Sequence, residues 1–557
     1  MSEANTVWYR RVLRWGQTNL TEIDPVRYDG AWWREHWQRT RVQGVIVNAG
    51  GIVAYYPSRY ELQHRAEYLG DRDLYGEISA AAREDGLSVV ARMDSNRADH
   101  RFFTEHPDWF TVDAEGRPYR AGDLYISCVN SPYYDEYLPG IFEEVIERYG
   151  PDGFADNSWS GLQRDRICYC VHCRRTFREH TGAELPTSHD WRSATYRAWI
   201  RWNYDRRLEI WDLNNAVTQR AGGKDCLWVG MNAGEITAQS KHFRDYRAIA
   251  QRAEVIFLDS QFRHAGQGFQ RNGEMGAALH GMLGWDKLIP ESMAMYGAGV
   301  PAFRLSSKSE PDARLWALDG FSGGIQPWWH HIGAYHDDRR QYRTAEPLFR
   351  WHEANESALM SRRPAATVGV VWSQENVDYY GADRTNERYS QPWTGMTDAL
   401  IRARIPYTPV HADDIGRESE HLAALVLPNV GLLSDSQIVS IRAFVAAGGG
   451  LLATGESSLC AADGSRRENF TLGDLFGVEA TGVHHGSETD NRESWDEWGQ
   501  HTYLRLHPER RHWIDGPQTG SEPDDETPRH EVLGGLDETD TMSFGGRIEV
   551  VRVSDGA

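Results

Sequence analysis

The sequence predicts an α/β protein: an N-terminal (β/α)₈ TIM barrel, then a flavodoxin-like α/β domain, and a small β-rich C-terminal segment. The chain has 557 residues, more than the roughly 100 to 250 of one domain. From about residue 40 to 330, short apolar runs alternate with longer amphipathic stretches, as in repeated βα units. At Ser361–Pro364 the pattern restarts. We therefore expect domains over residues 1–362, 363–480 and 481–557.

Eight short runs are the candidate barrel strands, and eight strands are what a closed barrel of this type needs. They are Gly44–Asn48, Leu87–Asp94, Asp123–Ser127, Asp152–Asp156, Cys226–Asn232, Ala253–Asp259, Lys287–Glu291 and Gly320–Gln326. Amphipathic stretches at 136–149 and 195–221 predict helices that cross between strands. Because parallel strands joined in this way end at the same rim, residues at the strand ends are the candidates for a site.

A second block of alternating patterns predicts the smaller domain. Ala366–Trp372 and Ala423–Pro428 are strand-like, and Gly448–Gly455 is a glycine-rich turn that enters a strand. This turn has neither the Lys-Ser/Thr of a phosphate-binding loop nor the spacing of a dinucleotide-binding loop, so we expect no organic cofactor. After about residue 480 the chain has a polar loop at 516–529 and a strand-like run at Gly546–Val553, which predicts a β-rich end.

Composition argues against some partners. A net charge of −21 disfavours nucleic acid, which needs a concentrated basic surface, and favours an uncharged or cationic ligand. The chain has no run of 18 or more apolar residues and no secretory pattern at its start, so we expect a cytoplasmic protein without a membrane partner. The 22 Trp and 25 Tyr offer faces on which sugar rings stack, although large barrels also bury many aromatic side chains.

Four cysteines have the spacing of a metal site. Cys168, Cys170 and Cys173 form C-x-C-x-x-C, and Cys128 stands about 40 residues earlier. Four thiolates suit tetrahedral zinc, and a site filled by four protein ligands is structural because a catalytic zinc keeps one position open. A reduced cluster without metal and a redox pair are the alternatives.

These residues resemble a known family. Cys128-Val-Asn-Ser-Pro-Tyr, Asp152-Gly-Phe-Ala-Asp-Asn and Cys168-Tyr-Cys-Val-His-Cys resemble family 42 β-galactosidases, and the pattern of the whole barrel is similar to hypothetical glycosyl hydrolase family 6. The resemblance implies a glycosidase of carbohydrate metabolism with a zinc ion on the four cysteines. It also implies a trimerisation domain from residue 366 to about 459, and hence a homo-oligomer, with a trimer favoured.

One position departs from the family. The β-galactosidases carry Asn-Glu after the fourth strand, with the Glu as general acid/base, whereas this chain has Asp156-Asn157-Ser158. We therefore do not transfer β-galactosidase activity to this chain. Another pair of carboxylates is needed, because glycoside hydrolysis uses two carboxyl groups on either side of the anomeric carbon.

Three acids at predicted strand ends are the candidate catalytic carboxylates: Asp156, Asp259 and Glu291. The positions of the first two are similar to those in α-galactosidase-like and α-fucosidase-like barrels. This similarity implies a retaining mechanism with Asp156 as nucleophile and Asp259 as acid/base. Glu291 is the rival for either role, or binds sugar hydroxyls.

Polar and aromatic residues near the strand ends are the candidate substrate contacts, and they suit a small, hydroxyl-rich ligand. They are Asn48, Tyr56, Arg59, Arg92, Asp94, Asn232, Gln261, Arg263, Trp328, Trp329 and His330. We expect a glycoside hydrolase that cleaves short oligosaccharides or glycosides. The alternatives are a transglycosylase that uses the same carboxylates and a catalytically inactive carbohydrate-binding homologue.

Overall fold

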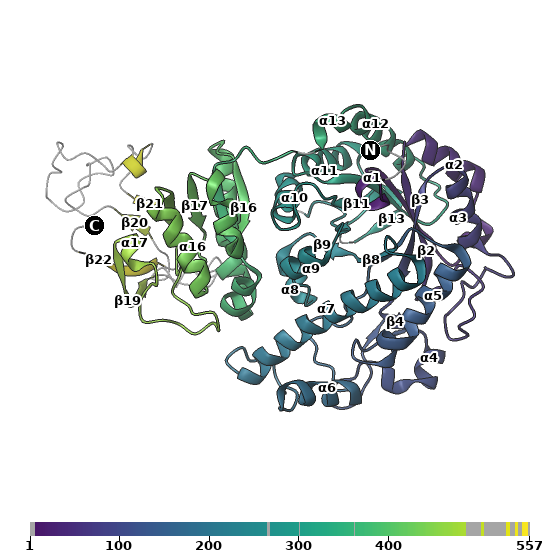
Figure 1. Cartoon of the computed structure of the whole chain (residues 1–557), viewed down its shortest axis with the longest axis horizontal. Helices are drawn as coiled ribbons and strands as arrows, with labels where there is room; N and C mark the ends of the chain where they lie inside the picture. The colour runs from purple at the N-terminus through teal and green to yellow at the C-terminus, as the bar shows by residue number, and fades with distance from the viewer. Residues whose placement is uncertain are drawn as a thin grey trace. The chain divides into compact units, whose positions relative to one another are not determined.

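The computed structural model describes residues 6–264, 268–299, 301–360, 362–485, 503–505, 531–534, 541–543 and 548–554. The chain divides into two compact units (Figure 1). One comprises residues 1–369 with 406–414, and the other comprises 370–405 with 415–557. The polar loop expected at 516–529 lies outside the described residues.

The first unit is a (β/α)₈ barrel, as the sequence predicts. Its sheet has the order β8-β7-β3-β2-β1-β14-β11-β10-β9. β8 (Leu227–Gly230) and β9 (Asn232–Ala233) are two parts of one strand, so the sheet closes on itself. The other members are β1 (Trp15–Asn19), β2 (Gly44–Gly51), β3 (Ser88–Asp94), β7 (Gly153–Asp156), β10 (Leu258–Asp259), β11 (Pro290–Ala294) and β14 (Gln326–Ile332). The strand pairs are parallel.

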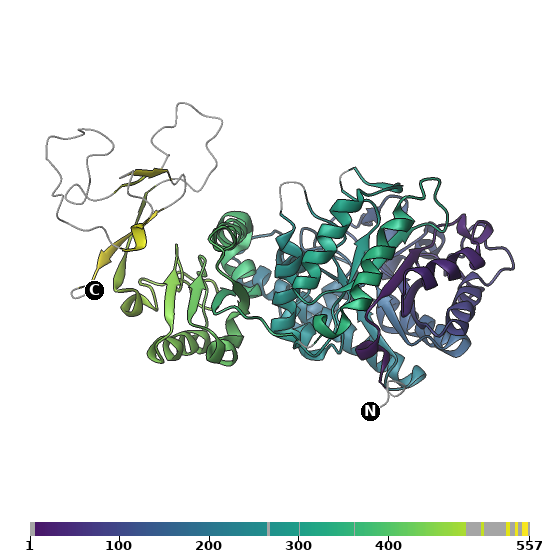
Figure 2. The ribbon, with the colours of Figure 1, turned by 90° about the horizontal axis from the view of Figure 1, so that it is seen from above.

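Helices surround the barrel strands (Figures 1 and 2). The helices of this unit are α1 (Trp8–Arg11), α2 (Gly30–Arg39), α3 (Leu74–Glu84), α4 (His100–Glu105), α5 (Leu138–Tyr149), α6 (Val171–Thr181), α7 (Ala194–Gly222), α8 (Ile236–Lys241), α9 (Tyr246–Arg252), α10 (Gln270–Leu283), α11 (Glu310–Ser322), α12 (Gln341–Ala354) and α13 (Glu356–Leu359), of which α4 and α6 lie away from the barrel strands. Asp29, Asp73 and Ser193 cap α2, α3 and α7 by accepting a hydrogen bond from a first-turn N–H. Among the described residues, no helix has the length and apolar character of a membrane span.

One barrel strand was missed and one predicted strand is wrong, and the two errors compensate along the chain. The prediction misses β1, because Trp-Gly-Gln-Thr-Asn contains no apolar run. The segment at 123–127 is not a barrel strand: β6 (Leu124–Ile126) forms a separate antiparallel sheet with β4 (Arg97–Ala98) and β5 (Arg120–Ala121). From β7 onward, the order of the strands is as predicted.

The last two barrel strands begin later than the sequence predicts. β11 begins at Pro290 rather than 287, and β14 begins at Gln326 rather than 320. Residues 320–322 end α11 instead. Gly323, which follows α11, allows this end of the helix to pack closely against α10. A Cβ at Gly323 would lie 2.1 Å from the carbonyl oxygen of Gly273 in α10. This shift changes which residue stands at the end of β11.

Aromatic side chains fill the barrel interior below the strand ends. Trp15 of β1 and Trp328 of β14 contact Phe257, with ring centroids 5.6 Å and 5.3 Å away. The adjacent Trp329 lies on the opposite face, 6.0 Å from the ring of Trp33 in α2. Side chains therefore alternate between the interior and the helix layer, and the polar residues gather above the aromatic ones.

The second sheet has the order β16-β15-β17-β18, in which the first strand lies between the second and the third, as in flavodoxin-like folds. Its strands are β15 (Val368–Trp372), β16 (Tyr407–His411), β17 (Ala424–Leu427) and β18 (Gly450–Ala453). The helices here are α14 (Gln391–Arg402), α15 (Ile415–Glu418), α16 (Asp435–Ala446) and α17 (Gly473–Phe476). Antiparallel pairs follow, formed by β19 (Val478–His485) with β22 (Ile548–Val553) and β20 (Tyr503–Arg505) with β21 (Thr541–Ser543). The second sheet and these pairs agree with the predicted fold class.

Candidate active site

Polar side chains meet inside the barrel at the carboxyl ends of its strands, here called the mouth. Arg92 of β3 contacts both carboxylate oxygens of Asp94 through Nε and Nη2, each at 3.3 Å. Asn48 Nδ2 donates to Asp94 Oδ2 at 3.4 Å, and Arg92 Nη1 donates to Asn19 Oδ1 at 2.7 Å. These contacts connect side chains from three neighbouring strands, and the guanidinium itself is held by Asp94 and Asn19.

Asp259 joins the same network through Asn157. With the Asn157 amide oriented to satisfy both of its groups, Nδ2 donates to Asp259 Oδ2 at 3.0 Å and Oδ1 accepts from Arg92 Nη2 at 3.1 Å. Gln261 Nε2 donates to Asp259 Oδ1 at 2.8 Å. Burial raises the pKa of Asp259, while the Gln261 hydrogen bond and the charge of Arg92 act in the opposite direction.

Asp94 and Asp259 are the partly exposed carboxylates of this network. The side chain of Asp94 is 23% exposed, although its partner Arg92 is buried. One guanidinium and one amide connect the two acids. Both acids therefore belong to one hydrogen-bonded network that solvent partly reaches.

Asp156 ends β7 as predicted, but its carboxylate does not join this network. It accepts hydrogen bonds from the Ser95 hydroxyl at 2.6 Å and the Ser158 N–H at 3.3 Å, and it is 1% exposed. Phe154, two residues earlier on the same face of the strand, packs against Phe142 of α5. Asp156 thus belongs to the helix-facing side of β7. Burial raises the pKa of Asp156 to about 7.

The prediction that Glu291 ends its strand is wrong, because β11 begins at Pro290 and Glu291 is its second residue. Glu291 Oε2 accepts from Asn272 Nδ2 of α10 at 2.8 Å. A Cβ at Gly320 of α11 would lie 3.5 Å from the same oxygen, so the carboxylate is enclosed between two outer helices. Burial raises the pKa of Glu291 well above its ordinary value. The next residue, Ser292, faces His330, with Oγ 3.1 Å from Nδ1.

The predicted substrate contacts divide into two groups. Asn48, Arg92, Asp94, Gln261 and His330 lie in the mouth. The others have partners outside the mouth. Tyr56 contacts Glu144 and Arg59 contacts Glu147 of α5, Asn232 contacts Gln239 of α8, and Arg263 pairs with Asp312 of α11. Trp328 packs against Phe257 in the barrel interior, and Trp329 packs against Trp33 of α2 outside the sheet. The first group is the part of the prediction that the structure brings together.

Four mouth residues escaped the sequence analysis: Gln17, Asn19, Asn157 and Tyr296. The Tyr296 hydroxyl donates to Gln261 Oε1 at 2.6 Å, and its ring lies 5.4 Å from that of His330. The alternation of side chains would have indicated Asn157, which follows Asp156 and so takes the opposite face. Asn19 could not be found without β1.

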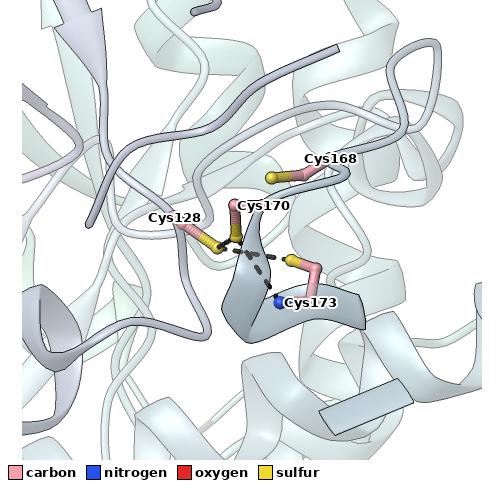
Figure 3. Close-up of side chains that lie close together, drawn as sticks. All are labelled: Cys128, Cys168, Cys170 and Cys173. Carbon is pink, nitrogen blue, oxygen red and sulfur yellow. Dashed lines mark hydrogen bonds between the residues drawn. The ribbon is translucent and has the colours of Figure 1, made fainter. Parts of the chain in front are cut away.

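The four predicted metal-ligating cysteines come together beside the barrel (Figure 3). Cys128, Cys168, Cys170 and Cys173 are buried, and their sulfur atoms all lie within 4.8 Å of one another. Tetrahedral zinc with bonds of about 2.3 Å places its sulfur ligands about 3.8 Å apart, so the donor set and its spacing fit such an ion.

Hydrogen bonds around these sulfur atoms are also of the kind that metal thiolates accept. The Asn130 N–H donates to Cys128 Sγ at 3.4 Å, and the Asn130 side-chain amide donates to Cys173 Sγ at 3.3 Å. Cys170 is the N-cap of α6 and accepts from the Cys173 N–H. Such donors orient metal ligands and favour their deprotonated form. The cluster could therefore hold a metal ion and tie the loop after β6 to the loop after β7.

Comparisons with known proteins agree with this barrel. Residues 33–158 match the family described as hypothetical glycosyl hydrolase 6. β-Galactosidase BgaP from Planococcus sp. (strain L4) is 37% identical over 75 residues, which is 13% of this chain and 11% of the relative. The match thus spans about a tenth of the length of this curated relative.

Several solved structures share the fold at low identity. α-L-Fucosidase isoenzyme 2 from Paenibacillus thiaminolyticus aligns with a TM-score of 0.72 at 17% identity, over 98% of this chain and 73% of that one. β-Galactosidase from Bacillus circulans sp. alkalophilus aligns with a TM-score of 0.69 at 15% identity, over 98% and 81%. A catalytic mutant of Gan42B, a GH42 β-galactosidase from G. stearothermophilus, aligns at 0.68 and 14%, over 86% and 77%. These matches confirm the predicted resemblance to glycosyl hydrolase barrels of the family 42 type.

Proposed function

We propose that this protein is a glycoside hydrolase that cleaves short oligosaccharides or small glycosides in the barrel mouth. The observation that carries the proposal is the partly exposed pair Asp94 and Asp259, connected through Arg92 and Asn157. TIM-barrel enzymes place their catalytic groups at this end of the barrel. The glycosyl hydrolase match over residues 33–158 includes Asp94 and Asn157.

The surroundings of the two carboxylates differ in the way that glycoside hydrolysis requires. Burial raises the pKa of Asp259, which favours the protonated form and suits a general acid. Asp94 faces the Arg92 guanidinium through both oxygens, which suits an ionised group. Asp259 therefore keeps the acid/base role predicted from the sequence, and Asp94 replaces Asp156 as the proposed nucleophile.

In the retaining reaction, Asp94 attacks the anomeric carbon and forms a glycosyl ester while Asp259 gives its proton to the leaving oxygen. Asp259 then takes a proton from water, and the water oxygen attacks the anomeric carbon and releases Asp94. Asn157 and Gln261 orient the Asp259 carboxylate through both oxygens. Glu291 has no role in this reaction, because it is buried between α10 and α11.

The test is an activity screen of the wild type against nitrophenyl α- and β-glycosides, including furanosides, with Asp259→Asn as the control. We expect turnover of at least one substrate, a large loss in the control, and a product whose initial anomer by NMR matches that of the substrate. Transfer of the sugar to added acceptors without free sugar would favour the transglycosylase. Binding of sugars without any turnover would favour the inactive homologue and contradict the proposal.

We also propose that the four-cysteine cluster holds one structural zinc ion. Cys173→Ser removes one ligand, and we expect loss of the bound zinc, measured by metal analysis, and destabilisation by about 3 kcal/mol or more. Cys226→Ser is the matched control, since Cys226 is buried away from the cluster. Equal zinc content in the two variants would contradict this role.

The homotrimer and the cytoplasmic location stay predictions of the sequence. Light scattering on the purified protein measures the oligomeric state directly.

A further inference from the structure

A hairpin borders the mouth next to the proposed acid/base. It consists of β12 (Tyr296–Gly297) and β13 (Phe303–Ser307). Tyr296, at its base, donates to Gln261, which in turn donates to Asp259. The backbone N–H of Met295, just before the hairpin, donates to the carbonyl of His330 at 3.1 Å. The hairpin is therefore joined to the site by its first residues.

The two strands of this hairpin differ in length. Tyr296 pairs with Ser307 and Gly297 with Phe303, so residues 304–306 bulge out between these two pairs. Bulges next to active sites redirect side chains. Phe303 and Leu305 are 62% and 65% exposed, whereas Arg304 lies close enough to Tyr296 and His330 for its positive charge to act on the pKa of both side chains.

Arg304 differs from the other arginine near His330. Arg92 is held by the carboxylate of Asp94. Arg304 is exposed, and no acidic side chain among the described residues forms an ion pair with it. Two further cations at the root of the hairpin, Lys308 and Arg263, contact the Asp312 carboxylate. Arg304 is thus a guanidinium near Tyr296 and His330 that no carboxylate of the described residues neutralises. This is notable in a chain whose net charge is −21.

We infer that the substrate carries a carboxylate, as in a glycoside of a uronic acid, and that Arg304 binds it. This inference rests on the proposed function and names its substrate class. The planar fork of arginine matches the two oxygens of a carboxylate. One carboxylate needs only one local positive charge, not the concentrated basic surface that a polyanion needs. The inference therefore departs from the uncharged or cationic ligand that the net charge of −21 favours.

The experiment compares pairs of nitrophenyl glycosides. In each pair, the neutral hexoside carries a hydroxymethyl group and the uronide carries a carboxylate in its place. The pairs cover the gluco and galacto series and both anomers. We expect the wild type to have a higher kcat/KM on a uronide than on its neutral counterpart. Arg304→Gln should reduce this preference by roughly 10- to 100-fold, as for the loss of a charge-assisted contact. Arg343→Gln, at an exposed position of α12, is the control and should keep the preference.

Binding measurements separate this inference from the proposed function. Calorimetry with free uronic acids and the matching neutral sugars measures recognition without turnover, and we expect uronate affinity to fall with added salt and in Arg304→Gln. Hydrolysis of neutral glycosides in preference to uronides would overturn the inference and leave the hydrolase in place. Uronate binding that needs Arg304, without turnover of any glycoside, would support the charge recognition and contradict the hydrolase. Equal uronate affinity of Arg304→Gln and wild type would overturn the inference.

Discussion

Two pairs of acids in the same barrel differ in exposure and in hydrogen-bond partners. Asp94 and Asp259 face the mouth, where arginine and amide groups contact them and solvent reaches them. Asp156 and Glu291 are almost wholly buried, and their partners are a serine hydroxyl and an outer-helix amide. A position near a strand end is therefore not enough to make an acid catalytic. The face of the strand and the residue at which the strand begins decide the outcome.

The buried pair differs from the mouth pair in what surrounds its carboxyl groups. Burial raises the pKa of Asp156 to about 7 and that of Glu291 well above its ordinary value. Among the described residues, neither has a cationic side chain as a hydrogen-bond partner, so their neutral forms are favoured. These two acids suit a structural role. In the mouth pair, burial raises the pKa of Asp259 alongside its contacts to amides, and Arg92 contacts both carboxylate oxygens of Asp94.

The largest expected effect comes from neutralising the four acids one at a time. Asp94→Asn and Asp259→Asn should each lower kcat by roughly 10³-fold or more, because each removes a group that acts on the reacting atoms. Asp156→Asn and Glu291→Gln should lower kcat by less than about 10-fold, since neutral amides replace carboxyls that are favoured as neutral. The measurement is kcat on the best substrate of the glycoside screen, with folding checked by circular dichroism.

The opposite ranking would overturn the comparison. An Asp156→Asn variant that is inactive but folded, beside an active Asp94→Asn variant, would restore the nucleophile predicted from the sequence. The product anomer would then need to be reassigned to that residue.

Much of the fold follows from the sequence, because periodicity depends on burial and burial is repeated in every βα unit. Long helices such as α5 and α7 were predicted to within a few residues. β1 was not predicted, because the positions of β1 that face the mouth, Gln17 and Asn19, are polar and so interrupt the apolar pattern of a core strand. The cysteine cluster could be predicted because four soft ligands in a fixed spacing have few other uses.

The site was predicted less well than the fold, because the face on which a side chain lies depends on the residue at which its strand begins and ends. A boundary error of three residues at β11 places Glu291 at the end of the strand instead of at its beginning. An error of one residue exchanges the two faces of a strand, and this separates Asp156 from Asn157. Hydrogen bonds between residues far apart in the chain, such as that from Tyr296 to Gln261, leave no local pattern at all.

The second prediction concerns stability and sharpens the contrast for Asp156. Its pKa rises from 3.8 to about 7 on folding, so the unfolded chain loses this proton first as the pH increases. The wild type therefore loses stability between about pH 4 and 7, whereas Asp156→Asn is spared this loss. Thermal or urea unfolding should find the variant relatively more stable at pH 8 by roughly 1 to 4 kcal/mol, with the difference vanishing near pH 4. A difference that grows as the pH falls would mean that a cation stabilises the Asp156 carboxylate.

The smallest expected effect comes from the hydrogen bond that Gln261 gives to Asp259. This bond acts to lower the pKa of Asp259, so Gln261→Leu should raise it further and move the alkaline limb of kcat/KM to higher pH. We expect kcat to fall by only about 10-fold, because the acid itself remains and only its orientation suffers. Tyr296→Phe, which removes the donor to Gln261 Oε1, should shift the limb in the same direction by less. An alkaline limb that stays in place in both variants would mean that another group gives the proton, and Asp259 would then join Asp156 and Glu291 as a structural acid.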